Sequence, residues 1–399
     1  MDAVSPALNA PLAADAPARV AHNVVIGITA FLTLVDLFAT QAILPSIAER
    51  YHASPAMAGT AVNACTLGMA IAALAVALLS PRIARRTGII VSLAVLFIPT
   101  TLLAFAPTLG VFALLRVAQG LCMATAFTLT LAYLGERNGG GAQPGAFAAY
   151  ITGNVASNLI GRLVAAAAAG ELGLNASFAL FAMLNLAGAA LAYATIAKPA
   201  RMPGRAAAAI SSLSGLLGHL SDRRLVAAFA IGFCILFAFI GTFTYVNFVL
   251  AAPPLAVGRM QIGLVYLVFL PSILTTPQAG LAVTRLGTRG AFSASLLLAA
   301  LGLPLLLAGS LTLVLTGLVL VGVGTFLAQA IATGFVGKAA RGDRGSASGI
   351  YLASYFSGGL AGAAVLGQTF ELAGWPACVL GVGAALVLAG LLGMALRAD

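Results

Sequence analysis

Long runs of apolar residues, separated by short polar segments, make up most of this chain. An α-helix rises 1.5 Å per residue, so about 20 apolar residues cross the roughly 30 Å hydrocarbon core of a bilayer. Counting the runs of suitable length predicts twelve membrane-spanning helices. Their expected ranges are 24–46, 57–79, 88–106, 109–134, 145–168, 175–197, 225–250, 260–283, 290–308, 311–336, 346–368 and 375–396. The pattern therefore predicts an all-α integral membrane protein.

The composition supports a membrane location. Of the 399 residues, 61% are hydrophobic and only 8% are charged, whereas a water-soluble protein has about 25% charged residues. The net charge of +10 would suggest a nucleic-acid partner in a soluble protein. Here the basic residues lie in short loops, so the lipid bilayer is the expected partner and nucleic acid is not. The four cysteines lie singly in predicted spans and the three histidines lie outside them, so no metal site, disulfide framework or cofactor is expected.

The longest polar break divides the predicted spans into two sets of six. Residues 1–23 lack the basic region of a signal peptide and are expected to form a disordered cytoplasmic tail. A six-helix bundle is expected over 24–197, a cytoplasmic linker over 198–224, and a second six-helix bundle over 225–399.

The distribution of Lys and Arg predicts the orientation. Twelve spans place sixteen of the 20 basic residues on one side, with Arg50 and Arg259 on the other and Arg116 and Arg162 within spans. Because basic loops stay on the cytoplasmic side, both termini are predicted to be cytoplasmic.

The two halves contain matching segments. Residues 77–86 after the second span match residues 280–289 after the eighth, and Glu171-Leu172 matches Glu371-Leu372 before spans six and twelve. Two parallel repeats related by an axis along the membrane normal are typical of rocking transporters with a site near the bilayer midplane. The sequence thus predicts two pseudo-symmetric six-helix bundles.

Two ionisable residues near mid-membrane stand out. Arg116 lies in an otherwise uncharged run from 110 to 134, and Asp36 is the only carboxylate within any predicted span. Counted at 1.5 Å per residue, the two lie about 20 Å and about 18 Å from the inner face. A guanidinium at this depth costs at least ~2.5–3.5 kcal/mol, so it should face the bundle interior and have a partner. Two interpretations stay open: a structural ion pair, or a proton-coupling site in which Asp36 carries the proton and Arg116 adjusts its binding.

Polar and aromatic residues in the spans are candidates for substrate contact. Thr29, Thr33, Asp36 and Thr40 form a polar stripe on one face of the first span, and Arg116, Gln119 and Met123 share a face of the fourth. The substrate-binding candidates are Thr33, Gln41, Gln119, Met123, Asn154, Asn158, Tyr245, Asn247, Gln329, Tyr351 and Tyr355. Each of them could instead serve helix packing. Arg162 continues the face of Asn154 and Asn158, and its position near the outer end would also allow it to snorkel to the headgroups.

On these motifs the chain resembles the major facilitator superfamily. The loop signature Gly-x3-Asp-Arg-x-Gly-Arg-Arg of that family is partly kept after the second and eighth spans, and Arg-x-x-Gln-Gly is intact at Arg116, Gln119 and Gly120. The resemblance implies a cytoplasmic gate at Arg82, Arg85, Arg86, Gly280, Arg285, Gly287 and Arg289. Pro81 and Thr284 replace the family's acid in the two copies, so any latch must use other groups. Asp36, Gln41 and Pro45 in the first span resemble bacterial drug- and arabinose-efflux permeases.

The resemblance implies a monomeric secondary transporter of the bacterial inner membrane that exchanges protons for an exported drug, sugar or metabolite. A proton-driven importer and a passive facilitator remain alternatives. A membrane-embedded enzyme is not expected, because the chain has no zinc-protease, serine-hydrolase or Walker motif.

Overall fold

The computed structural model describes residues 16–79, 83–137, 144–196, 218–340 and 344–396, and this part of the chain is helical without any strand. The first half contains α1 (Ala16–Ala42), α2 (Leu44–Arg50), α3 (Pro55–Asn63), α4 (Cys65–Leu79), α5 (Arg85–Leu103), α6 (Leu109–Arg137), α7 (Pro144–Glu171) and α8 (Leu174–Thr195). The second half contains α10 (Arg223–Ala251), α11 (Arg259–Val265), η3 (Tyr266–Phe269), α12 (Leu270–Thr275), η4 (Thr276–Gln278), α13 (Ala279–Gly302), η5 (Pro304–Leu307), α14 (Leu311–Ala339) and α15 (Arg344–Gly393).

Nine helical segments in the described ranges are long and apolar enough to cross a membrane. Two of them, Gln261–Leu307 and Gly345–Gly393, are much longer than one crossing requires. Each is interrupted at a glycine with positive φ, Gly287 at 71° and Gly374 at 74°, so each contains two helices. The chain is thus a multi-pass membrane protein, and the count of twelve crossings stays a prediction.

Two expected boundaries were wrong. Helix α1 begins at Ala16, inside the range expected to be a disordered tail, and Pro17 occupies its first turn, where the missing N–H costs nothing. Helix α10 begins at Arg223, inside the expected linker, because the Asp222 side chain accepts a hydrogen bond of 2.8 Å from the Arg224 backbone N–H and caps the helix. The rest of the expected tail (1–15) and most of the expected linker (198–217) lie outside the described residues.

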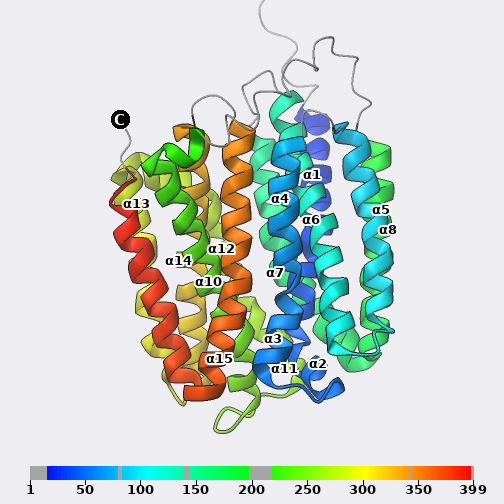
Figure 1. Ribbon diagram of the computed structural model, residues 1–399, viewed down its shortest axis with the longest axis vertical. Helices are drawn as coiled ribbons and strands as arrows, with labels where there is room; N and C mark the ends of the chain where they lie inside the picture. The colour runs from blue at the N-terminus through cyan, green and yellow to red at the C-terminus, as the bar shows by residue number, and fades with distance from the viewer. Residues whose placement is uncertain (1–15, 80–82, 138–143, 197–217, 341–343, 397–399) are drawn as a thin grey trace, which may run out of the picture.

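The helices of each half pack mainly with one another. In the first half α1 lies along α7, and α5 lies between α6 and α8; in the second half α10 lies along α15 and α13 along α14 (Figure 1). Small residues allow close crossings: a Cβ added at Gly68 or Gly120 would meet the backbone of the facing helix, so α4 and α6 touch backbone to backbone.

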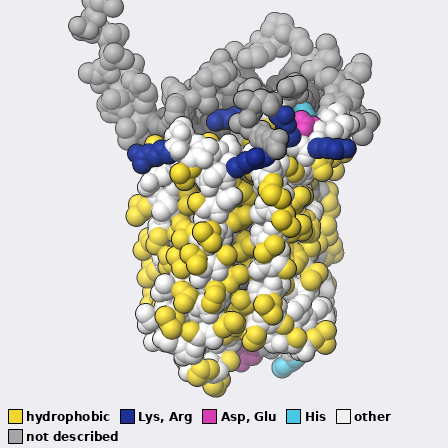
Figure 2. Space-filling view, turned by 90° about the vertical axis from the view of Figure 1, so that its left-hand side faces the viewer, with side chains coloured by type: hydrophobic (Ala, Val, Ile, Leu, Met, Phe, Trp, Pro, Cys, Tyr) yellow, Lys and Arg dark blue, Asp and Glu magenta, His cyan; other side chains and the backbone are white. Residues whose placement is uncertain are grey.

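The halves meet along two seams. Helices α3 and α4 pack against α15, and α7 packs against α11, η3 and α12 (Figure 1). The Lys and Arg side chains visible in Figure 2 gather at one end of the molecule. We call this the basic end; α5 begins there at Arg85 and α14 ends there just after Lys338. The other end, which carries α2 and the turn at Gly374, is called the far end.

Candidate functional site

The carboxylate of Asp36 lies inside the first half. Its Oδ2 accepts a hydrogen bond of 2.8 Å from Nδ2 of Asn185 on α8. The same Nδ2 lies 3.0 Å from Oγ1 of Thr100 on α5, and Gln119 on α6 donates to this hydroxyl at 2.7 Å. Asp36 is only 3% exposed, and the three partners are as deeply buried. The acid therefore sits in a closed polar network between α1, α5, α6 and α8, and its hydrogen-bonded oxygen faces α8 rather than the second half.

Arg116 belongs to the same network and is fully buried. Its Nη1 donates to Oε1 of Gln119 at 2.7 Å and to the backbone oxygen of Asp36 at 3.1 Å. The guanidinium thus binds the main chain of the residue whose carboxylate it was expected to pair with. The two charged residues are neighbours linked through Gln119, Thr100 and Asn185.

The guanidinium of Arg116 also holds a break between α3 and α4. Its Nε donates to the carbonyl oxygen of Val62 at 2.8 Å, and its Nη2 lies 3.0 Å from Sγ of Cys65. Helix α3 ends at Asn63 and α4 begins at Cys65, so carbonyl groups next to the break accept side-chain donors. The network around Asp36 therefore reaches the helix that forms one seam with the second half.

Asn63, at this break, connects the network to the interface. Its Oδ1 accepts from Nε2 of Gln41 at 2.6 Å, and its Nδ2 donates to Oγ1 of Thr244 on α10 at 3.1 Å. Oε1 of Gln41 in turn accepts from Nη2 of Arg162 on α7. All of these side chains are buried. We call Gln41, Asn63, Arg162, Asn247 and Tyr266 the interface cluster.

The guanidinium of Arg162 is enclosed by aromatic rings. Its Cζ lies 4.2 Å from the ring centre of Tyr266, 5.2 Å from Phe269, 5.5 Å from Phe38 and 5.8 Å from Phe243. The side chain is fully buried, so the snorkelling interpretation is wrong. Three of the four rings come from α10 and η3, so the first half's arginine inserts into the second half.

The other substrate-binding candidates in the first half differ in burial and in hydrogen bonding. Thr33 donates to the backbone oxygen of Thr29 one turn away, at 2.7 Å, as a packing hydroxyl does. Met123 is fully buried among apolar neighbours, and Asn154 is half-buried. Asn158 is fully buried, and within the described ranges neither its Oδ1 nor its Nδ2 has a hydrogen-bond partner.

In the second half, Asn247 and Tyr245 reach the first half. The Nδ2 of Asn247 lies 3.4 Å from the backbone oxygen of Gln41, and its Oδ1 accepts from the Tyr266 hydroxyl at 2.6 Å. The Tyr245 hydroxyl donates to the backbone oxygen of Ala363, and its ring lies against Gly59 of α3.

The remaining second-half candidates lie on α14 and α15. Tyr351 and Tyr355 stack with ring centres 6.1 Å apart, and Tyr351 packs against Gly232 within its own half. Gln329 on α14 is half-buried.

The expected gate arginines bind within their own halves. Arg86 donates to the carbonyl oxygens of Ile196 and Tyr193 at 2.7 and 2.8 Å, and Arg289 donates to the carbonyl oxygen of Met394. Each thus holds the end of the last helix of its half, where exposed carbonyls favour a cation.

The other residues of the predicted cytoplasmic gate have different local structures in the two copies of the motif. Arg85 begins α5, Arg285 is exposed, and Arg82 lies outside the described residues. Gly287 adopts a positive φ that strongly favours glycine, whereas Ala84 at the equivalent position has a φ of −65°. This explains why alanine suffices in the first copy. The gating role stays a prediction.

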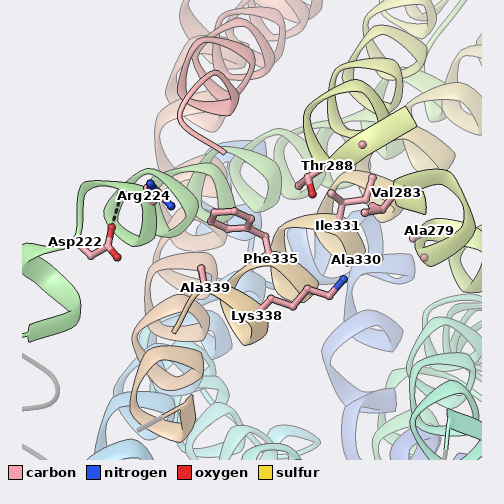
Figure 3. Close-up of a pocket in the computed structure, with 13 residues that line it drawn as sticks. Asp222, Arg224, Ala279, Val283, Thr288, Ala330, Ile331, Phe335, Lys338 and Ala339 are labelled. Carbon is pink, nitrogen blue, oxygen red and sulfur yellow. Dashed lines mark hydrogen bonds between the residues drawn. The ribbon is translucent and has the colours of Figure 1, made fainter. Parts of the chain in front are cut away.

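A cavity of about 850 Å³ opens at the basic end of the second half. It is lined by the start of α10, by α13 with the segment around Gly280 and Gly287, and by the last turns of α14. Figure 3 shows Phe335 and Lys338 of α14 at its wall, and Asp222 turned toward the Arg224 backbone that it caps. Asp222, Arg224 and Lys338 are the charged residues of this lining.

At the far end the two halves are also joined. Oε1 of Glu371, on α15, accepts a hydrogen bond of 2.8 Å from the backbone N–H of Ala56 in the first turn of α3. Next to it, Tyr245 fills the space between Gly59 and Gly367, and Gly263 of α11 lies against Ala166 of α7.

Sequence reasoning missed five residues of this arrangement: Asn63, Thr100, Asn185, Tyr266 and Glu371 in its bridging role. Asn185 and Asn63 carried a usable signal, because an amide within an apolar span needs a buried partner. Thr100 and Tyr266 carried none, since Thr and Tyr are common in such spans.

A helical shell of two halves with buried polar groups at its centre is the architecture of a membrane transporter. The profile of the Major Facilitator Superfamily matches residues 26–260, more than half of the chain. The chain belongs to this superfamily.

Its relatives are transporters. The chain is 24% identical over 328 residues to the uncharacterized MFS-type transporter YybF of Bacillus subtilis (strain 168), covering 82% of this chain and 81% of the relative. It is 26% identical over 365 residues to the inner membrane transport protein YnfM of Escherichia coli (strain K12), covering 92% and 88%. The fold matches the crystal structure of a mutant of the nucleoside transporter NupG with a TM-score of 0.71 and 13% identity, over 95% of this chain and 99% of that one. The protein is a small-molecule transporter and not an enzyme.

Proposed function

We propose that this transporter is a proton-coupled antiporter of the bacterial inner membrane that exports a small molecule, such as a drug, sugar or metabolite, by alternating access. The observation that carries the proposal is the position of the Asp36 carboxylate. It is the only acid within the predicted spans, it is buried, and it is hydrogen-bonded into a network that ends at the seam between the halves. Intramembrane acids placed in this way typically serve proton transfer.

Protonation would alter this network at a defined point. An ionised carboxylate only accepts hydrogen bonds, whereas a protonated one also donates. A proton on Asp36 therefore removes the charge that faces Asn185 and changes the hydrogen bonds of Thr100 and Gln119. Since Gln119 also accepts from Arg116, the change reaches the break between α3 and α4 and so one of the two seams.

The arrangement of the ends supports the remaining parts of the proposal. The basic end carries Lys and Arg (Figure 2) and would face the cytoplasm by the positive-inside rule, with both termini there. The far end is joined by Glu371 and Tyr245, so this state would be closed on the side opposite the cytoplasm. A monomer with the proton as its only coupling ion is sufficient for this cycle.

The test is Asp36→Asn in everted membrane vesicles with an imposed pH gradient, monitored by an acridine dye during addition of candidate substrates. An antiporter releases protons when its substrate enters, and Asp36→Asn should abolish that release while Glu171→Gln, which removes an exposed carboxylate, should not. Proton release that survives in Asp36→Asn refutes the coupling role. If substrate entry into the vesicles removes protons from the external medium instead of releasing protons into it, the protein is an importer. If substrate flux does not depend on the pH gradient, the protein is a facilitator.

A further inference from the structure

Arg162 is a buried cation for which the described part of the chain supplies no carboxylate partner. The only acid within the predicted spans is Asp36, and its Oδ2 is taken by Asn185. The guanidinium carries five N–H donors. Its Nη2 donates to Gln41, while Nε and Nη1 are buried and have no hydrogen-bond acceptor among the described residues. An uncompensated charge of this kind is costly, and it usually marks a place where a ligand supplies the missing charge.

A second group on the same helix has the same property. Asn158 precedes Arg162 by four residues on α7, so the two lie on one face, one turn apart. Both atoms of its amide are buried and unpartnered. A buried amide can donate two hydrogen bonds and accept two. Two adjacent, fully buried side chains with free donors therefore lie at the seam where α7 meets α11 and η3 (Figure 1).

The surroundings of these donors are aromatic. Tyr266 and Phe269 stack with ring centres 6.1 Å apart, and Phe239 and Phe243 lie 5.8 and 4.6 Å from Phe269. The four rings around Arg162 hold its charge in this closed seam through cation–π contacts. Since most of these rings belong to the second half, they move away from α7 when the halves separate, and the guanidinium then requires another partner.

We propose that Arg162, with Asn158, is the substrate-recognition site for a small organic anion: a carboxylate attached to a flat apolar or aromatic body. The carboxylate binds the free Nε and Nη1 groups of Arg162 in the paired geometry that a guanidinium favours. Asn158 donates to the same group or to a neighbouring polar atom, and the body of the substrate packs among Phe38, Phe243 and Phe269. This assignment rests on the proposed transport function but not on the role of Asp36.

The experiment measures ligand binding to the purified full-length protein in non-ionic detergent, free of anionic lipid, by thermal shift and equilibrium titration. The probes are three acids paired with their neutral amides: benzoate with benzamide, phenylacetate with phenylacetamide, and indole-3-acetate with indole-3-acetamide. At least one acid should bind about tenfold or more tightly than its amide, as expected for a charged hydrogen-bonded pair away from water. If no pair shows this preference in the wild-type protein, the proposal is overturned.

The variants test whether Arg162 and Asn158 produce the preference for acids over amides. Arg162→Gln should reduce it to less than about threefold, and Arg162→Lys, which keeps the charge but loses the planar fork, should retain an intermediate preference. Asn158→Ala should weaken acid binding several-fold. The matched control Arg50→Gln removes an exposed arginine at the far end and should leave the preference intact; a loss there instead of in Arg162→Gln overturns the assignment. If Arg162→Gln cannot be purified, Arg162→Lys tests the assignment alone. An unchanged preference for acids in Arg162→Lys contradicts a paired contact between the carboxylate and the guanidinium.

The same assay separates the two proposals. Asp36→Asn should keep the acid preference even though it loses proton coupling. If Asp36→Asn keeps both the preference for acids over amides and the proton-coupled transport, the proposed role of Asp36 in antiport is refuted. The proposed anion site is then still supported.

Discussion

The contact between Glu371 and α3 gives the sharpest prediction about alternating access. The carboxylate accepts from the Ala56 N–H at the start of a nine-residue helix. A charged acceptor at a helix N-terminus contributes about 0.5–2 kcal/mol as a cap and interacts with the helix dipole. Because Glu371 is itself exposed, solvent screens the interaction, and we take about 0.5–1.5 kcal/mol. With 1.36 kcal/mol per factor of ten, Glu371→Ala should shift the population toward an open far end by about two- to thirteenfold.

The assay is a spin–spin distance measurement between labels at Met57 on α3 and Leu372 on α15, which are 58% and 85% exposed. Both are changed to Cys in a background without the four native cysteines. In the parent protein the short-distance population should dominate, and Glu371→Ala should transfer part of it to longer distances. Glu171→Gln is the control, because Glu171 is the repeat equivalent of Glu371 and is exposed at the end of α7. An unchanged distance distribution in Glu371→Ala would show that the cap does not hold the halves together.

Two further predictions concern the first half. Asn185→Leu removes the donor to Asp36, and the loss of a charged hydrogen bond of about 1.5–3 kcal/mol should lower proton-coupled flux at least tenfold, as for Asp36→Asn; flux within twofold of the wild type would exclude the network from coupling. Gly120→Ala places a Cβ against the backbone of Cys65 and should cost about 1–3 kcal/mol, seen as a lower unfolding temperature. Gly334→Ala, where a Cβ meets nothing within 4 Å, should unfold no earlier than the parent.

The helical architecture was accessible from the sequence, because burial in lipid demands apolar runs of a fixed length. The direction in which individual side chains point could not be predicted from the sequence. Asp36 and Arg116 were expected at one level, and the structure places them as neighbours, but the Asp36 carboxylate binds Asn185 instead of the guanidinium. Rotation about a helix axis depends on packing against neighbouring helices, which a hydropathy pattern does not report. The cage around Arg162 was invisible for a similar reason, since a phenylalanine in an apolar run looks the same whether it faces lipid or a cation.

The break in the second predicted span bears on how variants of Arg116 should be interpreted. The arginine supplies a donor to the carbonyl oxygen of Val62 at the point where two helical segments meet. Removing it leaves this buried acceptor with only the weak thiol donor of Cys65 and frees the angle between the segments during insertion and assembly. We therefore expect Arg116→Gln to reduce the yield of correctly folded protein before it reveals any defect in turnover, so transport rates for this variant need to be normalised to the folded fraction.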